Sequence, residues 1–214
     1  MVSGFGCGPT GAPPAFPEPD ADLTAANVAM GDPYEGRFPL EEALADLPPG
    51  NALIATLQTS EGAIRCRLDP DHAPLSVANF VGLARGLRPF REPDGAWVRV
   101  PYYAEMPWHR AVEGQLVQTG RRGTLAHGGF FLQDEVGYGD SFDRGGVLAM
   151  ANTGSEHSGS VEFFVTTAPA AHLEGGHTIL GECDDEATVR RIERRVVRDD
   201  KPSPTLVRID ISRQ

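Results

Sequence analysis

An arginine and a glutamine lie close together in the segment WHRAVEGQLVQTG, at residues 108–120 of this 214-residue chain. Arg110 has a permanent positive charge and a planar set of donors. Gln118 has an amide that both donates and accepts hydrogen bonds. Such a pair can stabilise electron density that develops on a substrate atom without forming a covalent bond.

Three later segments combine apolar residues with single polar side chains. They are VLAMANTG at 147–154, GSVEFFVTT at 159–167 and AHLEGGHTILG at 171–181. Asn152 supplies an amide in the first of them, and Glu162 supplies a carboxylate in the second. The four segments together therefore combine an arginine, amides and apolar residues.

Motifs for metal, phosphate or covalent chemistry are not found in the sequence. There is no phosphate-binding glycine loop, no CxxC pair and no HExxH segment. His172 and His177 flank Glu174, but their spacing places the two histidines on neither one helix face nor one strand face. The serines beside His157 lack the strand, sharp turn and helix of a nucleophilic serine. We therefore expect no metal, no cofactor and no nucleophilic residue.

These four segments, in this order and at this spacing, resemble the cyclophilins, the peptidyl-prolyl cis-trans isomerase family. That family reads F-H-R-V-I-x-G-F-M-x-Q-G-G, then L-S-M-A-N-A-G, then N-G-S-Q-F-F, and then a short loop that ends L-D-G-x-H-T-V-F-G. The segment SVANF at residues 76–80 also looks like the first helix of the family. The resemblance covers residues 51–213 and implies an eight-stranded barrel with two capping helices.

The resemblance carries over a set of site residues, and some positions depart from the family pattern. Arg110 matches the catalytic arginine, and the other matching positions are Gln118, Ala151, Asn152, Phe164, Leu173 and His177. Four further site positions differ from the pattern in residue type. An aromatic residue is replaced by Gln115, methionine by Leu116, glutamine by Glu162, and a frequent tryptophan by His172.

The resemblance implies a reaction that suits these residues, because proline isomerisation breaks no bond and moves no proton. Rotation about a peptide C–N bond has a barrier of about 18–20 kcal/mol, although the two X-Pro isomers differ by only about 0.5–1 kcal/mol. In the twisted state the lone pair of the proline nitrogen becomes available to a donor. Arg110 is the candidate donor, and a preference of about 4 kcal/mol for the twisted state would accelerate the exchange roughly a thousandfold.

The remaining residues would position the substrate. We expect an apolar pocket for the proline ring from Phe164, Leu116 and Leu173. Asn152 would anchor the peptide backbone, and Gln118 would orient Arg110 or bind the carbonyl before proline. The alternative is a cyclophilin-like peptide-binding or holdase module with little turnover. It stays open because Gln115 places an amide in the apolar wall, and because Glu162 could pair with Arg110 and occupy its donors.

Composition limits the partners. The chain has 19 basic and 30 acidic residues and a net charge of −11, which argues against electrostatic binding to nucleic acid or to anionic membranes. No run of about 20 apolar residues occurs, so we expect no transmembrane helix. We expect a monomer whose partners are proline-containing polypeptides.

Hydrophobic periodicity divides residues 51–214 into eight strands and two helices. The helices are expected over 74–84 and 185–197, because the apolar residues of each share one face. Many short strands between glycine-rich turns predict a closed, mainly β, antiparallel barrel that the helices cap. The expected strands are 52–58, 63–68, 108–112, 115–119, 147–151, 163–167, 178–182 and 206–211, with 88–105 as a loop.

The first 50 residues differ in composition and read as a tail or tether. They hold nine of the 18 prolines, so we expect an extended chain through residue 35 and one short helix near 40–47. Cys7 precedes a Gly/Pro tether, as in a mature lipoprotein, but no leader pattern stands before it. Cys7 is therefore a possible lipid anchor or a free tail cysteine, and the location is either cytoplasmic or the bacterial envelope.

Cys66 and Cys183 fall on or beside predicted strands. Two interpretations stay open: two buried free thiols, or one disulfide that joins neighbouring strands of a closed barrel. A bridge would close a loop of over 100 residues, which the chain-entropy model values at about 4.7 kcal/mol.

Overall fold

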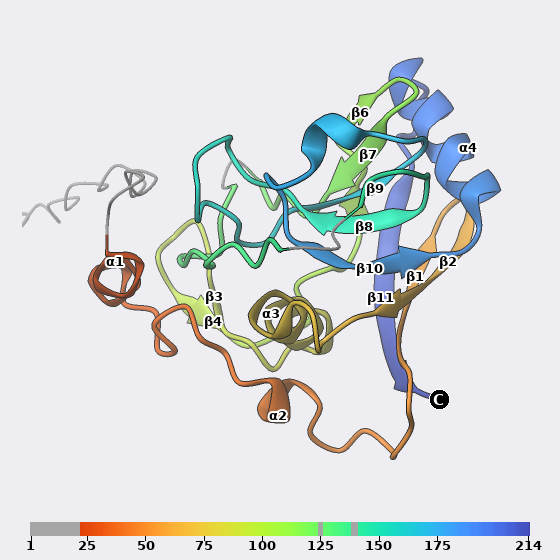
Figure 1. The fold of residues 1–214 in the computed structure, drawn as a ribbon. Coiled ribbons are helices and arrows are strands. Elements are labelled where there is room, and N and C mark those ends of the chain that lie inside the picture. Colours follow the sequence, from red (N-terminus) through yellow and green to blue (C-terminus); the bar gives the residue numbers. More distant parts are fainter. Residues whose placement is uncertain (1–21, 124–125, 138–140) are drawn as a thin grey trace, which may run out of the picture.

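A curled sheet of nine antiparallel strands forms the body of the molecule in this computed structural model, which describes residues 22–123, 126–137 and 141–214 (Figure 1). The strand order is β5-β11-β1-β2-β10-β8-β9-β7-β6, and β3 and β4 form a separate pair. The bounds are β1 Leu53–Thr59, β2 Gly62–Leu68, β3 Phe90–Arg91, β4 Trp97–Val98, β5 Met106–Pro107, β6 Arg110–Val112, β7 Leu116–Thr119, β8 Val147–Met150, β9 Phe163–Thr166, β10 Ile179–Cys183 and β11 Thr205–Arg213.

Two twelve-residue helices cover the sheet at the predicted places. They are α3 (Pro74–Arg85), which contacts β11, and α4 (Glu186–Val197), which contacts β6, β7 and β2. Proline suits the first turn of α3, and Gly86 ends that helix in the left-handed conformation at φ 73°. Burial of one apolar face holds α4 on the sheet, with Val189 and Ile192 inside the main core.

The predicted number of strands was wrong, because the sheet also contains β5, which lies just before the predicted strand 108–112, and the chain turns a corner at the start of that predicted strand. The indole of Trp108 is fully buried at this corner, so Met106–Pro107 pairs with β11 while Arg110–Val112 pairs with β7. The loop predicted over 88–105 also contains the β3–β4 hairpin. Its turn, Pro93-Asp94-Gly95, is a recognisable turn sequence, and Gly95 has a φ of 91°.

Closure of the barrel by backbone pairing is not seen among the described residues. The two end strands of the sheet, β5 and β6, are separated by only two residues in the chain. The sheet must therefore curl so that its two ends come close together. The hydroxyl of Thr119 on β7 donates to the carbonyl of Pro107 on β5 at 2.9 Å. A side-chain bond therefore links strands from the two ends of the sheet.

Residues 22–50 are folded against the domain, so the expectation of an extended chain through residue 35 is wrong for residues 22–35. Helix α1 (Leu23–Met30) begins at Asp22, whose carboxylate accepts from two backbone amides of its first turn. The predicted short helix is present as α2 (Leu40–Ala43). Residues 1–21, including Cys7 and its predicted lipid anchor, lie outside the described part of the chain.

A buried ion pair explains why this segment is ordered. Both oxygens of Asp32 accept from Arg88, at 2.6 and 2.8 Å, and both side chains are fully buried. The Arg88 guanidinium also lies 3.9 Å from the ring centre of Phe130. The amide of Asn27 donates to the carbonyl of Phe131 and accepts from its backbone N–H. A composition-based interpretation misses these contacts, because the partners lie 56 and 104 residues away.

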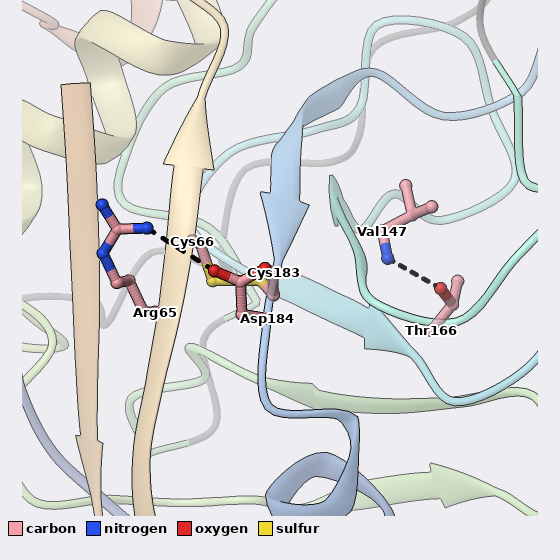
Figure 2. The surroundings of a disulfide bond; sticks show 6 residues. All are labelled: Arg65, Cys66, Val147, Thr166, Cys183 and Asp184. Carbon is pink, nitrogen blue, oxygen red and sulfur yellow. Dashed lines mark hydrogen bonds and ion pairs between the residues drawn. A yellow bond between two sulfur atoms is a disulfide. The ribbon is translucent and has the colours of Figure 1, made fainter. Parts of the chain in front are cut away.

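Cys66 and Cys183 form a disulfide, so the interpretation as two free thiols is not supported (Figure 2). The two cysteines lie directly opposite each other on β2 and β10. Their Cα atoms are 3.8 Å apart, closer than the usual 5.5–6 Å. The bond thus joins strands that are adjacent in the sheet and 117 residues apart in the chain.

Across the described residues, no helix combines the length and the apolar character that crossing a bilayer requires.

Candidate active site

Arg110 and Gln118 lie opposite each other on the β6–β7 hairpin. A guanidinium nitrogen of Arg110 donates to Gln118 Oε1 at 2.9 Å. The hairpin turn contains Gly114, which has a φ of 69° and therefore suits glycine. The buried carboxylate of Glu193 on α4 accepts from Gly114 N at 2.8 Å and from the Thr167 hydroxyl at 2.7 Å. Helix α4 therefore holds the turn that carries the arginine.

Glu162 lies directly before β9 and is 4% exposed. Its Oε2 accepts from Gln118 Nε2 at 2.6 Å, and its Oε1 accepts from Arg121 Nε at 2.7 Å. His109 Nε2 lies 3.2 Å from Oε2. The direct pairing of Glu162 with Arg110 that the sequence left open is not seen, because Gln118 lies between the two charges.

Opposing effects act on the pKa of Glu162, and their sum lowers it. Burial is the largest and favours the neutral acid, but the contacts from His109, Arg121 and Gln118 favour the charged carboxylate and together outweigh it. The carboxylate is therefore ionised at neutral pH.

A small apolar cluster lies apart from the main core and contains the residues predicted to hold a proline ring. Its buried members are Leu116, Phe142, Val147, Ala149, Ala151, Phe164 and Ala170, and Leu173 packs against them. The ring of Phe142, which the sequence did not single out, stacks on Phe164 at 6.2 Å between centres. The structure therefore brings together Leu116, Phe164 and Leu173 as expected.

His177 lies with its ring edge-on to Phe164, at 5.2 Å between ring centres. Its Nδ1 is 3.0 Å from the carbonyl oxygen of Met150. Burial lowers the pKa of His177, and it outweighs the opposing effects of the Met150 carbonyl and of Asp134. The imidazole is therefore mainly neutral at pH 7 and forms part of the wall of the apolar cluster.

Asn152 follows the apolar cluster, and its amide makes one hydrogen bond within its own loop and one to the loop that carries His177. Nδ2 donates to the carbonyl of Gly176 at 2.7 Å, and Oδ1 accepts from Gly154 N at 3.1 Å. The neighbouring Ala151 donates its backbone N–H to the carbonyl of Glu162 at 3.0 Å. Asn152 thus connects the loop after β8 to the loop that carries His177.

Gln115 and His172 lie at the margin of the site. Gln115 contributes backbone bonds to the hairpin turn, and its carbonyl accepts from Thr167 N at 2.8 Å. His172 is exposed in the short 3₁₀ turn Ala171–Leu173. Neither residue belongs to the apolar cluster or to the polar chain from Arg110 to Glu162.

Sequence reasoning gave no role to His109 and Arg121, although both lie at Glu162. Strand alternation would place His109 on the face opposite to its neighbour Arg110. The corner at Trp108 breaks that alternation. Arg121 follows Gly120, whose φ of 95° turns the chain in a way that periodicity does not reveal.

No group of three or more His, Cys, Asp or Glu side chains that could hold a metal ion occurs in the described part of the chain.

Comparisons with known proteins agree with this geometry. The model of the cyclophilin type peptidyl-prolyl cis-trans isomerase/CLD family matches residues 54–213. Peptidyl-prolyl cis-trans isomerase B of Streptomyces anulatus is 39% identical over 163 residues, which cover 74% of this chain and 89% of that protein. Peptidyl-prolyl cis-trans isomerase A of Mycobacterium tuberculosis is 37% identical over 142 residues, which cover 65% of this chain and 78% of that protein.

A solved structure shares the fold. The crystal structure of a Cryptosporidium parvum cyclophilin type peptidyl-prolyl cis-trans isomerase aligns with a TM-score of 0.63 at 20% identity. The alignment covers 77% of this chain and 99% of that one.

Proposed function

Because the chain belongs to the cyclophilin-type peptidyl-prolyl cis-trans isomerase family, we propose that Arg110 is the catalytic residue with which it accelerates rotation about X-Pro bonds. The family match and the named relatives support isomerase activity for this protein. The observation that carries the role of Arg110 is its position beside Gln118, two strands from Phe164 of the apolar cluster.

The row of residues across the sheet supports this role. Arg110 on β6 is opposite Gln118 on β7, which is opposite Phe164 on β9, which is opposite Ala149 on β8. Directly paired residues point to the same face of an antiparallel sheet. With strands about 4.8 Å apart, the backbones at Arg110 and Phe164 are separated by about 10 Å. A proline residue with its preceding peptide bond would lie over Gln118, with the ring towards Phe164 and the peptide bond towards Arg110.

In this arrangement the proline ring lies against Phe164, Leu116 and Leu173, while its nitrogen faces Arg110. The twisted amide exposes a lone pair on that nitrogen, which a guanidinium N–H can bind more strongly than it binds the planar ground state. The planar peptide offers no such lone pair because its electrons are delocalised. The donor therefore stabilises the transition state selectively and needs no nucleophile.

The test compares the wild type with Arg110→Ala in a protease-free assay of a proline peptide, such as exchange spectroscopy between cis and trans signals. We expect kcat/KM to fall at least tenfold in Arg110→Ala, with an unchanged circular dichroism spectrum. Arg99→Ala is the control, because Arg99 contacts Tyr34 and Glu42 in the N-terminal segment. Unchanged turnover in Arg110→Ala would remove the proposed mechanism. Binding of the peptide without turnover by the wild type would favour a peptide-binding module.

We also propose that residues 51–214 form the isomerase domain and that its sheet behaves as a closed barrel. The family match over 54–213 supports the boundary. The bond from Thr119 to Pro107 and the two-residue gap between β5 and β6 support closure.

A further inference from the structure

We propose that Glu162 is a positioning residue, whose carboxylate fixes the amide of Gln118 in the orientation that presents its oxygen to Arg110. The inference rests on the proposed role of Arg110 as the catalytic residue. It replaces the expectation that Glu162 binds substrate or competes for the arginine.

The argument starts from the two ends of the Gln118 amide. Its oxygen accepts from Arg110 at 2.9 Å, and its nitrogen donates to Glu162 at 2.6 Å. A half-turn of the amide would place the oxygen against a carboxylate, which only accepts, and the NH₂ against a guanidinium, which only donates. Both contacts would then be repulsive. Between two charged neighbours of opposite sign, the amide therefore has a single favourable orientation.

A glutamine at position 162, as in the family pattern, would not impose this choice. A neutral amide can both donate and accept, so it can pair with either end of Gln118. At its end of the amide the carboxylate of Glu162 removes this ambiguity, because an ionised carboxylate is an acceptor only. It adds to the preference that Arg110 imposes at the other end, so the charged residue orders Gln118 more strongly than the usual glutamine would.

The carboxylate itself is firmly held. Arg121 Nε donates to Oε1 of Glu162 at 2.7 Å, and His109 Nε2 lies 3.2 Å from Oε2, the oxygen that also accepts from Gln118. The Glu162 side chain is 5% exposed, which excludes most water that could compete for these contacts. The Arg121 side chain is 44% exposed, so it can turn to solvent when Glu162 is replaced. We therefore expect the variants at position 162 to fold.

The consequence for Arg110 is a restricted guanidinium. Arg110 is exposed at the end of the sheet and would otherwise sample several rotamers in solvent. One nitrogen is committed to Gln118, which leaves other N–H groups to meet the substrate. A donor that is oriented before substrate arrives avoids an ordering cost in the reaction itself.

The test is a double-mutant cycle on catalysis with Glu162→Ala, Gln118→Ala and the double variant. We expect each single variant to lower kcat about tenfold with KM changed less than twofold. We expect the double variant to match Gln118→Ala within twofold, because Glu162 acts through Gln118. Glu162→Gln should fall between the wild type and Glu162→Ala.

Arg121→Ala and Arg122→Ala form a matched pair of control variants. Their side chains are 44% and 41% exposed, but Arg121 binds Glu162 whereas Arg122 binds Glu92. We expect only Arg121→Ala to lower kcat, by a few fold. Equal effects of the two variants would contradict the inference. Multiplicative effects in the double-mutant cycle would also contradict it, as would Glu162→Gln being faster than the wild type.

A measurement without turnover separates this inference from the proposed function. We expect the side-chain NH₂ signals of Gln118 and the Nε–H signal of Arg110 to be sharp in nitrogen-15 spectra of the wild type and broadened in Glu162→Ala. Unchanged signals would overturn the positioning role of Glu162. A wild type without isomerase activity would overturn the proposed function, while these signals would still decide the role of Glu162.

Discussion

Reduction of the Cys66–Cys183 bond should lower stability by an amount that follows from the loop it closes. The two cysteines are separated by 117 residues. In the chain-entropy model a loop of this length removes roughly 16 cal/mol/K from the unfolded chain, which is about 4.9 kcal/mol at 25 °C. For a chain of this size each kcal/mol corresponds to about 2–4 °C in Tm, so we expect Tm to fall by about 10–20 °C.

The assay is urea unfolding of three forms: the oxidised wild type, the reduced wild type and Cys66→Ala/Cys183→Ala. The reduced wild type keeps both sulfur atoms, so its difference from the oxidised form isolates the cross-link. The double variant adds the loss of packing at Cys66, which is fully buried, and should be the least stable. Equal midpoints for the oxidised and reduced wild type, with equal slopes against urea, would refute the reasoning.

Two further predictions concern buried charge and pH. Asp32→Ala should lower the free energy of unfolding in urea by about 3–5 kcal/mol, because it leaves Arg88 buried without its partner. Asp22→Ala, at the exposed start of α1, should lower it by only about 1 kcal/mol. Similar losses for both variants would show that the ion pair is not what holds the segment. The lowered pKa of His177 means that the unfolded chain binds a proton more readily than the folded one, so its contribution favours folding at neutral pH and is lost as pH falls through the ordinary histidine range near 6.5. His177→Gln should therefore lose less stability than the wild type between pH 7.5 and 5.5, and parallel losses would contradict this.

Alternation predicted the second strand well because one of its faces is buried. Ile64, Cys66 and Leu68 lie in the core, while Arg65 and Arg67 between them do not. Periodicity reports burial directly, so strands and helices of this kind are visible in a single sequence.

The N-terminal segment was not predictable in the same way. Its proline-rich, acidic composition resembles that of unfolded tails, yet Asp32 is buried against an arginine 56 residues away. Composition gives the number of charged residues but does not show which of them form ion pairs in the folded protein.

The site was predictable in its residues and not in its connections. The apolar residues Leu116, Phe164 and Leu173 form one cluster, as the family resemblance implied. The contacts of His109 and Arg121 with Glu162 depend on a corner at Trp108 and a turn at Gly120. Neither feature leaves a periodic signal, so the partners of Glu162 could only be seen in the structure.

The contacts of the N-terminal segment set an order in time as the chain is made. Asp32 leaves the ribosome 56 residues before Arg88, so the carboxylate is already present when the arginine appears. The hydrogen bonds of Asn27 cannot form until Phe131 has been synthesised, 104 residues later. At about 5–20 residues per second this wait lasts about 5–20 s. The first described helix therefore cannot make this contact until more than half of the chain has been made, although it can do so before β8–β11 and α4 are made.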